Sequence, residues 1–305
     1  MAEPSAWWGV LLPLLLVLFA VAAASFDNVL AARAAGAPAD PLGPLRSVAG
    51  LLVQQRRRTI AADSLLRRAG GFALLVAAFL ASAATPFGHL VTADLSVGVV
   101  WFNAMEVVAW AAVWLVGWGS NSAFGLVAGY RFVALGLAYE LPHMFALITA
   151  AVGAGSLRVS DIAAAQDGLW FAVWMPVAFV VYLVSVLGMS FFRPFDQAVS
   201  REAAGGVLVE LPGVDRLVFL AGRWLLLVSG SAMAVPLFLG GGSGPLLPGW
   251  LWSVLKTAAV LALLVWTGRR VPTIRVERFQ EIAWIVLIPA TLVQALVVSI
   301  VVVVQ

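Results

Sequence analysis

The stretch from Gly117 to His143 is apolar enough to cross a membrane as a helix, yet it carries ionisable side chains. Arg131, Glu140 and His143 all lie within it. A charged group in hydrocarbon is costly, so such residues pair with other groups or take part in ion or proton transfer. Arg131 and Glu140 are nine residues apart, and at about 100° per residue they fall on opposite faces of a helix. We therefore expect each of them to face a different neighbouring helix.

The residues alone leave more than one role open for each of these groups. Glu140 is either a proton relay or a structural acid that pairs across helices, whereas Arg131 is interpreted as a structural counter-ion. His143 directly follows Pro142. Because proline interrupts helical hydrogen bonding, we interpret His143 as a hydrogen-bonding residue at a helix end.

Two more ionisable residues, Glu106 and Lys256, lie inside apolar segments. At about 1.5 Å of rise per residue, both are about 16 Å from the same side of the membrane, and Arg131 is about 12 Å from it. Two hypotheses remain open for Glu106 and Lys256. They belong to a layer of ionisable groups that serves transport, or they form an interhelical ion pair with no transport role.

The elements that must position these groups are apolar helices. The chain is 63% hydrophobic and 11% charged, which is far more apolar than a soluble domain of 305 residues requires. Runs of about 20 apolar residues, the length that spans a bilayer, recur along it. We predict an all-α, polytopic membrane protein that forms one integral membrane domain over residues 1–305, with about eight spans: Ala6–Phe26, Gly70–Pro86, Val97–Trp118, Ala123–Val152, Leu169–Phe192, Leu217–Leu239, Leu247–Trp266 and Ile282–Val304.

Basic residues predict the orientation of these spans. The loops at 27–69, 193–216 and 267–280 hold seven, three and four of them, whereas the opposite side holds Arg158 alone. Because positive loops stay in the cytoplasm, both termini are expected outside it. The bias of 17 arginines to one lysine is typical of a GC-rich bacterial genome, so we expect a bacterial plasma membrane. Leu51–Leu66 has apolar residues at helical spacing beside a basic run, which predicts a helix that lies along the membrane surface.

Composition also limits the chemistry that the chain can perform. It contains no cysteine and two histidines, so cysteine-ligated iron–sulfur clusters are excluded and a protein-only transition-metal site is not expected. Any redox centre must lie in another subunit. The basic residues fall mostly in loops between spans, which indicates membrane orientation and not nucleic-acid binding.

One motif resembles a known family. Gly117, Trp118, Ser120, Asn121 and Ser122 are followed by an arginine and then by a Tyr-Glu pair, here Arg131 and Tyr139-Glu140. This combination is similar to the fourth-helix motif of a membrane protein family of respiratory complex I, the proton-pumping NADH:quinone oxidoreductase. Members of that family, its H subunits, join the hydrophilic arm of the complex to the membrane arm. Related proteins occur in membrane-bound hydrogenases and formate hydrogenlyases.

Two further blocks carry the same resemblance over the rest of the chain. Arg193-Pro194-Phe195-Asp196, then Glu202 and Glu210-Leu211-Pro212-Gly213, look like the acidic loop of the family. Leu255-Lys256-Thr257 and the segment from Arg269 to Pro289 resemble its C-terminal part. An acid that the family has early on its sixth helix corresponds here to Gly222, beside Arg223.

The resemblance implies a coupling role. Quinone reduction on the cytoplasmic side would drive proton movement through buried carboxylates, with Glu140 as a relay and Arg131 tuning a set of acids at the cytoplasmic side, namely Asp196, Glu202 and Glu210. Those three acids also fit an ordinary solvated loop. No cofactor is expected on this chain itself. The implied partners are hydrophilic subunits that carry iron–sulfur clusters and flavin, antiporter-like membrane subunits, lipid and the quinone substrate.

Three alternatives stay open at this point. The first is the equivalent component of a membrane-bound hydrogenase or formate hydrogenlyase-type complex. The second is a secondary transporter in which Arg131, Glu140 and Lys256 bind substrate at the midplane. The third is a structural scaffold that keeps the fold without proton transfer.

Overall fold

The computed structural model describes residues 3–4, 6–55, 57, 59–199 and 204–304. Within that part of the chain, seven helices are long and apolar enough to cross a membrane. They are α1 (Ala6–Ala34), α3 (Ser64–Ala83), α4 (Gly98–Gly119), α5 (Ala123–Ala154), α9 (Gly213–Phe238), α10 (Gly249–Arg270) and the continuous run Val276–Val304. The all-α, polytopic fold predicted from composition is confirmed.

The fifth predicted span, Leu169–Phe192, is divided in two. Helix α7 (Phe171–Trp174) ends shortly before Pro176, where α8 (Pro176–Met189) begins. Proline has no N–H for a helical hydrogen bond, but it is tolerated at the first position of a new helix. The segment is therefore a short apolar helix preceded by a single turn.

The helix predicted over Leu51–Leu66 is not observed. Leu51–Leu66 is not one helix: α2 covers Gly43–Val53, and α3 begins at Ser64. Asp63 starts α3, because its side chain accepts hydrogen bonds from the backbone N–H groups of Leu65 and Leu66. The prediction failed because the apolar spacing extends past Val53, where α2 ends, and past Asp63, where a separate helix begins.

The shorter elements complete the chain. Strands β1 (Glu3–Pro4) and β2 (Leu90–Val91) pair in parallel, and α6 (Val159–Ala164) lies in the connection that follows α5. In the described residues between α8 and α9, two 3₁₀ turns occur, η1 (Asp196–Ala198) and η3 (Gly206–Leu208). The C-terminal run consists of α11 (Val276–Ile282), the π-helical turn η4 (Ala283–Leu287) and α12 (Ile288–Val304).

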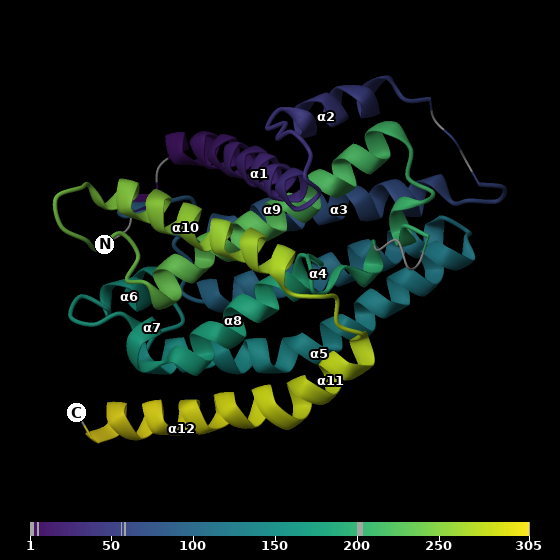
Figure 1. Ribbon diagram of the computed structural model, residues 1–305. Helices are drawn as coiled ribbons and strands as arrows, with labels where there is room; N and C mark the ends of the chain where they lie inside the picture. Colours follow the sequence, from purple (N-terminus) through teal and green to yellow (C-terminus); the bar gives the residue numbers. More distant parts are fainter. Residues whose placement is uncertain (1–2, 5, 56, 58, 200–203, 305) are drawn as a thin grey trace.

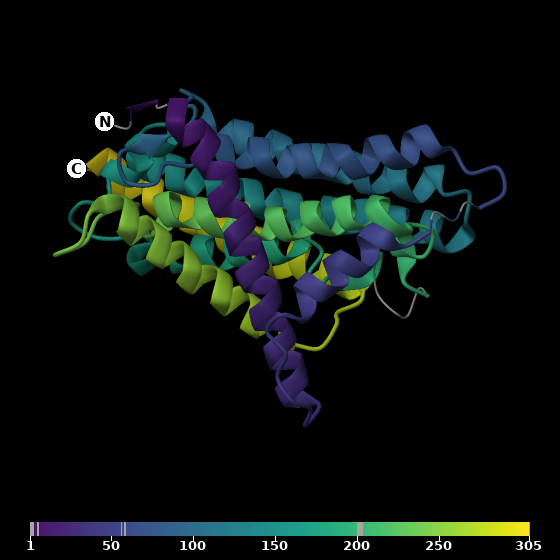
Figure 2. The ribbon, with the colours of Figure 1, turned by 90° about the horizontal axis from the view of Figure 1, so that it is seen from above.

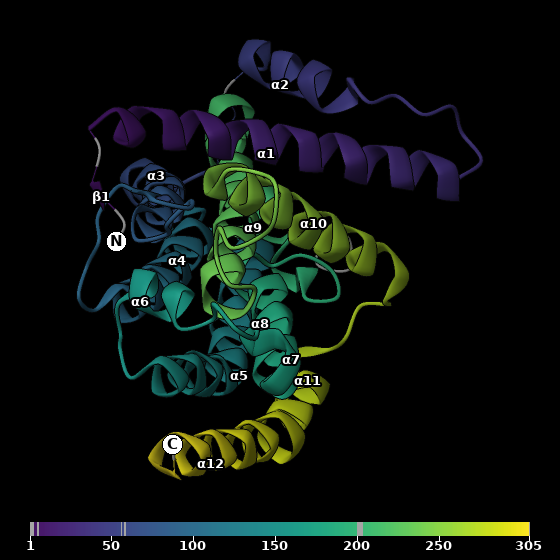
Figure 3. The ribbon, with the colours of Figure 1, turned by 90° about the vertical axis from the view of Figure 1, so that its left-hand side faces the viewer.

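Helices α3, α4, α5, α8 and α9 form the centre of the bundle, and α1 and α12 lie on opposite flanks of it (Figures 1 and 3). Figure 2 shows α1 crossing the bundle obliquely. The N- and C-terminal ends lie together at one end of the molecule, and the connection from α2 to α3 lies at the other (Figures 1 and 2). Termini at the same end require an even number of crossings, so the shorter segment Phe171–Met189 is counted together with the seven long helices.

Glycines set the closest helix contacts around the candidate site. A Cβ on Gly117 would lie 2.4 Å from the carbonyl oxygen of Gly125, so α4 and α5 approach each other at this pair. A Cβ on Gly222 would lie 3.0 Å from both Cγ of Leu74 and the backbone nitrogen of Leu75. An acidic side chain at position 222, which the sequence resemblance leads us to expect, would have to displace Leu74 or the backbone at Leu75, because α9 packs directly on α3 here.

Candidate functional site

Helices α4 and α5 carry a ladder of polar contacts in the core of the bundle. The side-chain amide of Asn103 donates a hydrogen bond of 2.7 Å to Oε1 of Glu140. Further along, Nε1 of Trp110 donates one of 2.8 Å to the hydroxyl of Tyr139. Between these two contacts along α4 lies Glu106, which is fully buried. The face of α5 that carries Glu140 is therefore buried but polar, and it contacts α4 through hydrogen bonds as well as through apolar packing.

Glu106 pairs with His143 across the same interface. Nε2 of His143 lies 2.9 Å from Oε1 of Glu106, and both side chains have no exposed surface. The distance is that of an ion pair, but the ring nitrogen is not aligned for a standard hydrogen bond. The imidazole is held by aromatic rings, with Tyr182 stacked 5.2 Å away and Phe102 at 6.3 Å between centroids.

Several atoms of this cluster have no hydrogen-bond partner among the described residues. They are both carboxylate oxygens of Glu106, Oε2 of Glu140, Oδ1 of Asn103 and both ring nitrogens of His143. Buried polar atoms are normally satisfied, and exceptions gather at sites with chemical roles. The cluster therefore has free acceptor positions at which a proton can bind.

The local sequence explains how the ladder is positioned. Gly136 lies under the indole of Trp110, because a Cβ there would be 2.7 Å from the ring. Gly188 on α8 gives the ring of Tyr139 similar room, with a contact of 2.8 Å. Asn121, in the turn between α4 and α5, has a φ of 45°, a conformation that asparagine tolerates better than most residues. Its side chain also donates a hydrogen bond to the backbone carbonyl at position 60.

Two interpretations from the sequence are wrong here. His143 is not at a helix end, because α5 continues through Pro142 to Ala154. Glu106 and Lys256 do not form an ion pair. Instead, Nζ of Lys256 donates to three backbone carbonyls, those of Leu239, Gly241 and Ser243, at 2.7, 3.0 and 2.8 Å. Those carbonyls lie where α9 ends, and helix ends leave carbonyl groups without partners that a cation can satisfy.

A cavity of about 1030 Å³ lies at the other end of α5 and is rich in arginine. Its charged lining residues are Arg131, Arg193, Arg223, Arg269 and Arg275, with Asp196 and Glu277. Arg131 lines this cavity, whereas Glu140 is buried against Asn103 of α4, so the two side chains have different neighbours, as their spacing predicts. The excess of positive charge gives the cavity a positive potential, which attracts anionic groups.

Arg223 is held against the wall of this cavity. Its Nη2 donates a hydrogen bond of 2.8 Å to the carbonyl of Phe191, and its guanidinium lies 4.1 Å from the ring centroid of Phe192. Cation–π contact of this kind stabilises a partly desolvated guanidinium. Arg223 therefore contributes a positioned positive charge to the wall of the cavity.

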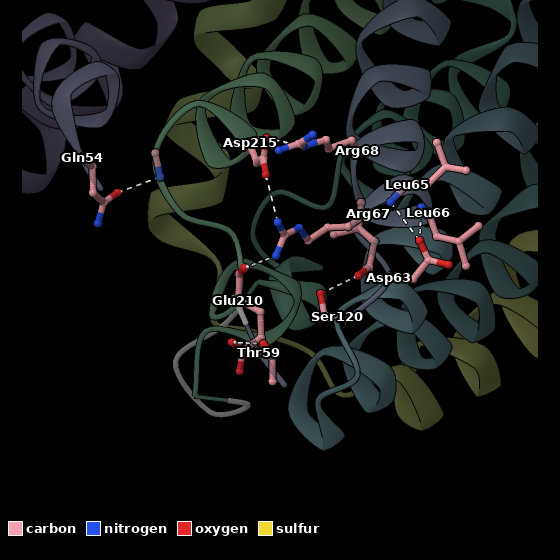
Figure 4. A network of polar contacts seen from close by, with 12 residues as sticks. Gln54, Thr59, Asp63, Leu65, Leu66, Arg67, Arg68, Ser120, Glu210 and Asp215 are labelled. Carbon is pink, nitrogen blue, oxygen red and sulfur yellow. Dashed lines mark hydrogen bonds and ion pairs between the residues drawn. The ribbon is translucent and has the colours of Figure 1, made fainter. Parts of the chain in front are cut away.

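Two of the three predicted acids of the 193–216 loop, Asp196 and Glu210, lie in different places. Asp196 lines the arginine cavity, where Oδ2 lies 3.3 Å from Nε of Arg193. Glu202 lies outside the described residues. Glu210 belongs to a separate network at the start of α3, shown in Figure 4, where Thr59 donates a hydrogen bond of 2.7 Å to its carboxylate.

The same network holds the buried Arg67, which is 2% exposed. Its guanidinium donates to the backbone carbonyl of Glu210 at 3.3 Å and pairs with Asp215 at 3.2 Å (Figure 4). Gly213, between these two acids, donates its N–H to the side chain of Gln54 at 2.9 Å. The network joins the start of α3 to the start of α9, which is a structural role.

Sequence reasoning missed two features of the buried cluster. Asn103 was not singled out, and His143 was not connected to Glu106. One signal was present: Asn103 and Glu106 are three residues apart, as are Glu140 and His143, so each pair lies on one face of its helix. In the described part of the chain, no three His, Asp or Glu side chains are grouped so as to hold a metal ion.

Comparison with known proteins identifies the family. A model of the NADH dehydrogenase family matches residues 12–299. The chain belongs to this family. It is 34% identical over 267 residues to an H subunit of NADH-quinone oxidoreductase from Geobacter sulfurreducens, the one numbered 2, covering 84% of this chain and 81% of that protein. It is 32% identical to the NADH-quinone oxidoreductase H subunit of Rhodospirillum centenum, covering 83% and 79%, and 31% identical to the Burkholderia vietnamiensis protein of the same name, covering 86% and 79%.

Membership of this family confirms the resemblance found in the fourth helix and in the C-terminal segment. It makes the chain a multi-pass membrane protein of an oxidoreductase family. The motif residues now have structural places: Gly117 sets the approach of α4 to α5, and Asn121 forms the turn between them. The Tyr139-Glu140 pair contributes both of its side chains to the buried ladder.

Proposed function

We propose that this chain is the membrane-arm coupling subunit of a proton-translocating NADH:quinone oxidoreductase, and that Glu140 carries protons in it. The observation that supports this role most directly is the environment of Glu140. One carboxylate oxygen is held by Asn103, while the other is buried and has no partner among the described residues. A carboxylate positioned in this way is fixed in space and still able to take up a proton.

The names of the relatives favour this complex over the hydrogenase-type alternative. All of the relatives compared above are H subunits of NADH-quinone oxidoreductases. The family also favours an oxidoreductase component over a secondary transporter. Iron–sulfur clusters and flavin belong, in this proposal, to hydrophilic partner subunits, because the chain has no cysteine to ligate a cluster.

In the proposed orientation, the end of the bundle that carries the arginine cavity faces the cytoplasm of a bacterial cell. The basic loops lead to that end, and both termini lie at the other end, on the extracytoplasmic side (Figure 1). The hydrophilic partner subunits bind over the cavity. The apolar flanks formed by α1 and α12 face lipid and antiporter-like membrane subunits, because both helices expose most of their length.

The coupling proposed here begins at the cavity. Quinone reduction in an adjoining chamber adds negative charge at the cytoplasmic side, where five arginines and two acidic residues line the cavity. A new anion attracts those guanidinium groups and changes their pairing with Asp196, which has one unpartnered buried oxygen among the described residues. Glu140 lies about 13 Å further along α5 than Arg131. A change in the charge around Arg131 therefore acts on α5, the helix that also carries Glu140, the proposed relay residue.

The test is Glu140→Gln in the complex purified from its native membrane and reconstituted into liposomes. Glutamine keeps the size and can still bond to Asn103, but it cannot carry a proton. We expect proton translocation to fall at least about tenfold while the complex still assembles. Thr149→Val is the control, since Thr149 is a buried polar residue of α5 whose hydroxyl bonds to the carbonyl of Phe145 one turn earlier. Normal translocation by the assembled Glu140→Gln complex would exclude the relay and favour a scaffold.

A further inference from the structure

The imidazole of His143 is a buried titratable group that the relay described above does not use. It packs against α4 and α8 through the rings of Phe102 and Tyr182, which also lie 6.5 Å from each other between centroids. Its only charged neighbour at ion-pair distance in the described chain is Glu106, at 2.9 Å. Tyr182 is fixed in turn, because its hydroxyl donates a hydrogen bond of 2.8 Å to the carbonyl of Gly230. The ring is therefore held in place by packing, and its charge depends on Glu106.

Two states of the Glu106–His143 pair are compatible with this environment. In one, an imidazolium faces a carboxylate; in the other, a neutral imidazole faces a carboxylic acid. The two differ by one proton that moves between Nε2 and Oε1, with no change in the number of protons or electrons. A buried site that excludes water penalises separated charges and brings such states close in energy. A pair of this kind can hold or pass a proton.

The pair lies next to the proposed relay. Glu140 and His143 are three residues apart on α5, which puts their Cβ atoms about 5–6 Å apart on one face. Asn103 and Glu106 have the same spacing on α4 and face them. Oε2 of Glu140 and Nδ1 of His143 are both buried without a partner among the described residues. These four side chains form one polar cluster in the bundle core, outside the arginine cavity.

We propose that His143 is a proton-carrying residue that connects Glu140 to Glu106. A proton that leaves the Glu140 carboxyl binds the neighbouring imidazole, and the imidazolium then gives a proton from Nε2 to Oε1 of Glu106. Other titratable groups at the cluster are the phenols of Tyr139 and Tyr182, which bond to Trp110 and to the Gly230 carbonyl. This inference rests on the proposed function, since it extends the relay at Glu140.

The experiment separates proton transfer from structural pairing through a double variant. Glu106→Gln or His143→Gln alone leaves one ionisable group buried without its partner, which destabilises a protein whether or not the pair carries protons. The double variant Glu106→Gln with His143→Gln removes both groups and leaves two amides of similar size. A purely structural pair tolerates this change, whereas a proton-carrying pair does not. The exchanged variant, Glu106→His with His143→Glu, restores a carboxylate and an imidazole at the same place.

All variants are measured as assembled complexes in liposomes, by electron transfer to quinone and by proton translocation. We expect the double Gln variant to assemble, and the number of protons that it translocates per electron to be at least about tenfold lower than in the native complex. The exchanged variant should recover part of this loss. Native translocation by the double Gln variant would overturn the role of His143. The role of His143 would also be overturned by a second combination of results: the double Gln variant does not assemble, and His143→Gln translocates protons as the native complex does.

The Glu140→Gln variant distinguishes this inference from the proposal on which it rests. Loss of translocation in Glu140→Gln with normal translocation in the double Gln variant leaves the relay intact and removes His143 from it. Normal translocation in Glu140→Gln overturns both. Thr149→Val changes another buried polar position of α5, and we expect it to translocate protons as the native complex does. If Thr149→Val lost as much translocation as the double variant, replacing any buried polar residue of α5 would explain the loss. That result would also overturn the role of His143.

Discussion

Asn103 on α4 donates a hydrogen bond of 2.7 Å to Glu140 on α5 and so fixes one oxygen of the carboxylate in the centre of the bundle. The contact crosses between two helices that are joined by a tight turn, so its geometry depends on their close packing. Glu140 has no other side-chain hydrogen bond in the described part of the chain. We therefore expect the orientation of the Glu140 carboxylate to depend on Asn103.

Replacement of Asn103 by leucine is expected to lower proton translocation without removing the protein from the complex. The carboxylate loses its donor and becomes a buried group without a partner, at a cost of roughly 1–3 kcal/mol. Asn103→Gln keeps an amide and should recover part of the loss. The measurement is translocation per electron in liposomes, with subunit content followed by mass spectrometry. Equal translocation in the leucine variant and the native complex would show that Asn103 does not orient Glu140.

Lys256 is predicted to hold the loop after α9 and to act independently of Glu106. Lys256→Met removes the donor to the carbonyls of Leu239, Gly241 and Ser243, and each unsatisfied carbonyl costs roughly 1–3 kcal/mol if it stays buried. We expect faster hydrogen exchange in residues 239–244 and a lower melting temperature. Glu106→Gln should leave exchange in that loop unchanged. If hydrogen exchange in this loop increased as much in Glu106→Gln as in Lys256→Met, the two residues would be coupled, as an ion pair between them would predict.

Gly222→Ala should destabilise the protein by about 1–3 kcal/mol, because the added methyl group meets Leu74 and Leu75 at 3.0 Å and forces α9 away from α3. Gly71→Ala is a matched control. It is also a buried helical glycine, but a Cβ there has no neighbour within 4 Å. The comparison is made by thermal unfolding in detergent. A control that loses as much stability as Gly222→Ala would argue against close packing as the cause.

The two adjacent arginines of α3 are expected to differ greatly in their contribution to stability. Arg67 is 2% exposed and pairs with Asp215, so Arg67→Met leaves a carboxylate without its nearest partner and costs roughly 3–5 kcal/mol. The Arg68 side chain is 42% exposed and lies 3.7 Å from the same carboxylate, so Arg68→Met should cost about 0–1 kcal/mol. Protein levels in the membrane and melting temperature provide the measurement, and similar losses in both variants would contradict the burial argument.

Arg131 is predicted to affect coupling and not assembly. It is exposed to the arginine cavity, so Arg131→Gln removes a positive charge there without breaking a buried contact. We expect a several-fold loss of coupled quinone reduction with normal subunit content. Arg278→Gln is the control, since Arg278 is a surface residue paired with Glu281 three positions later. A defect in Arg278→Gln as large as that of Arg131→Gln would mean that net charge alone matters.

Much of the fold follows from the sequence because the bilayer sets the length of a span and excludes unpaired backbone groups. Apolar runs therefore locate seven helices in the described chain, and for α4 and α5 the predicted ends lie within a few residues of the observed ones. The boundaries that were missed have local causes. Pro176 divides one predicted span, and Asp63 starts α3 where apolar spacing alone predicted a continuing helix.

The sequence by itself determined the family, the membrane-spanning class and the presence of ionisable groups at depth. It also determined that Arg131 and Glu140 face opposite ways, because helical periodicity depends only on residue spacing. Only the tertiary structure decided which groups meet. Glu106 pairs with His143, and Lys256 binds the carbonyls at the end of α9. Side chains on different helices meet according to the rotation and offset of those helices, and both depend on packing contacts, such as Gly117 against Gly125, that no single helix contains.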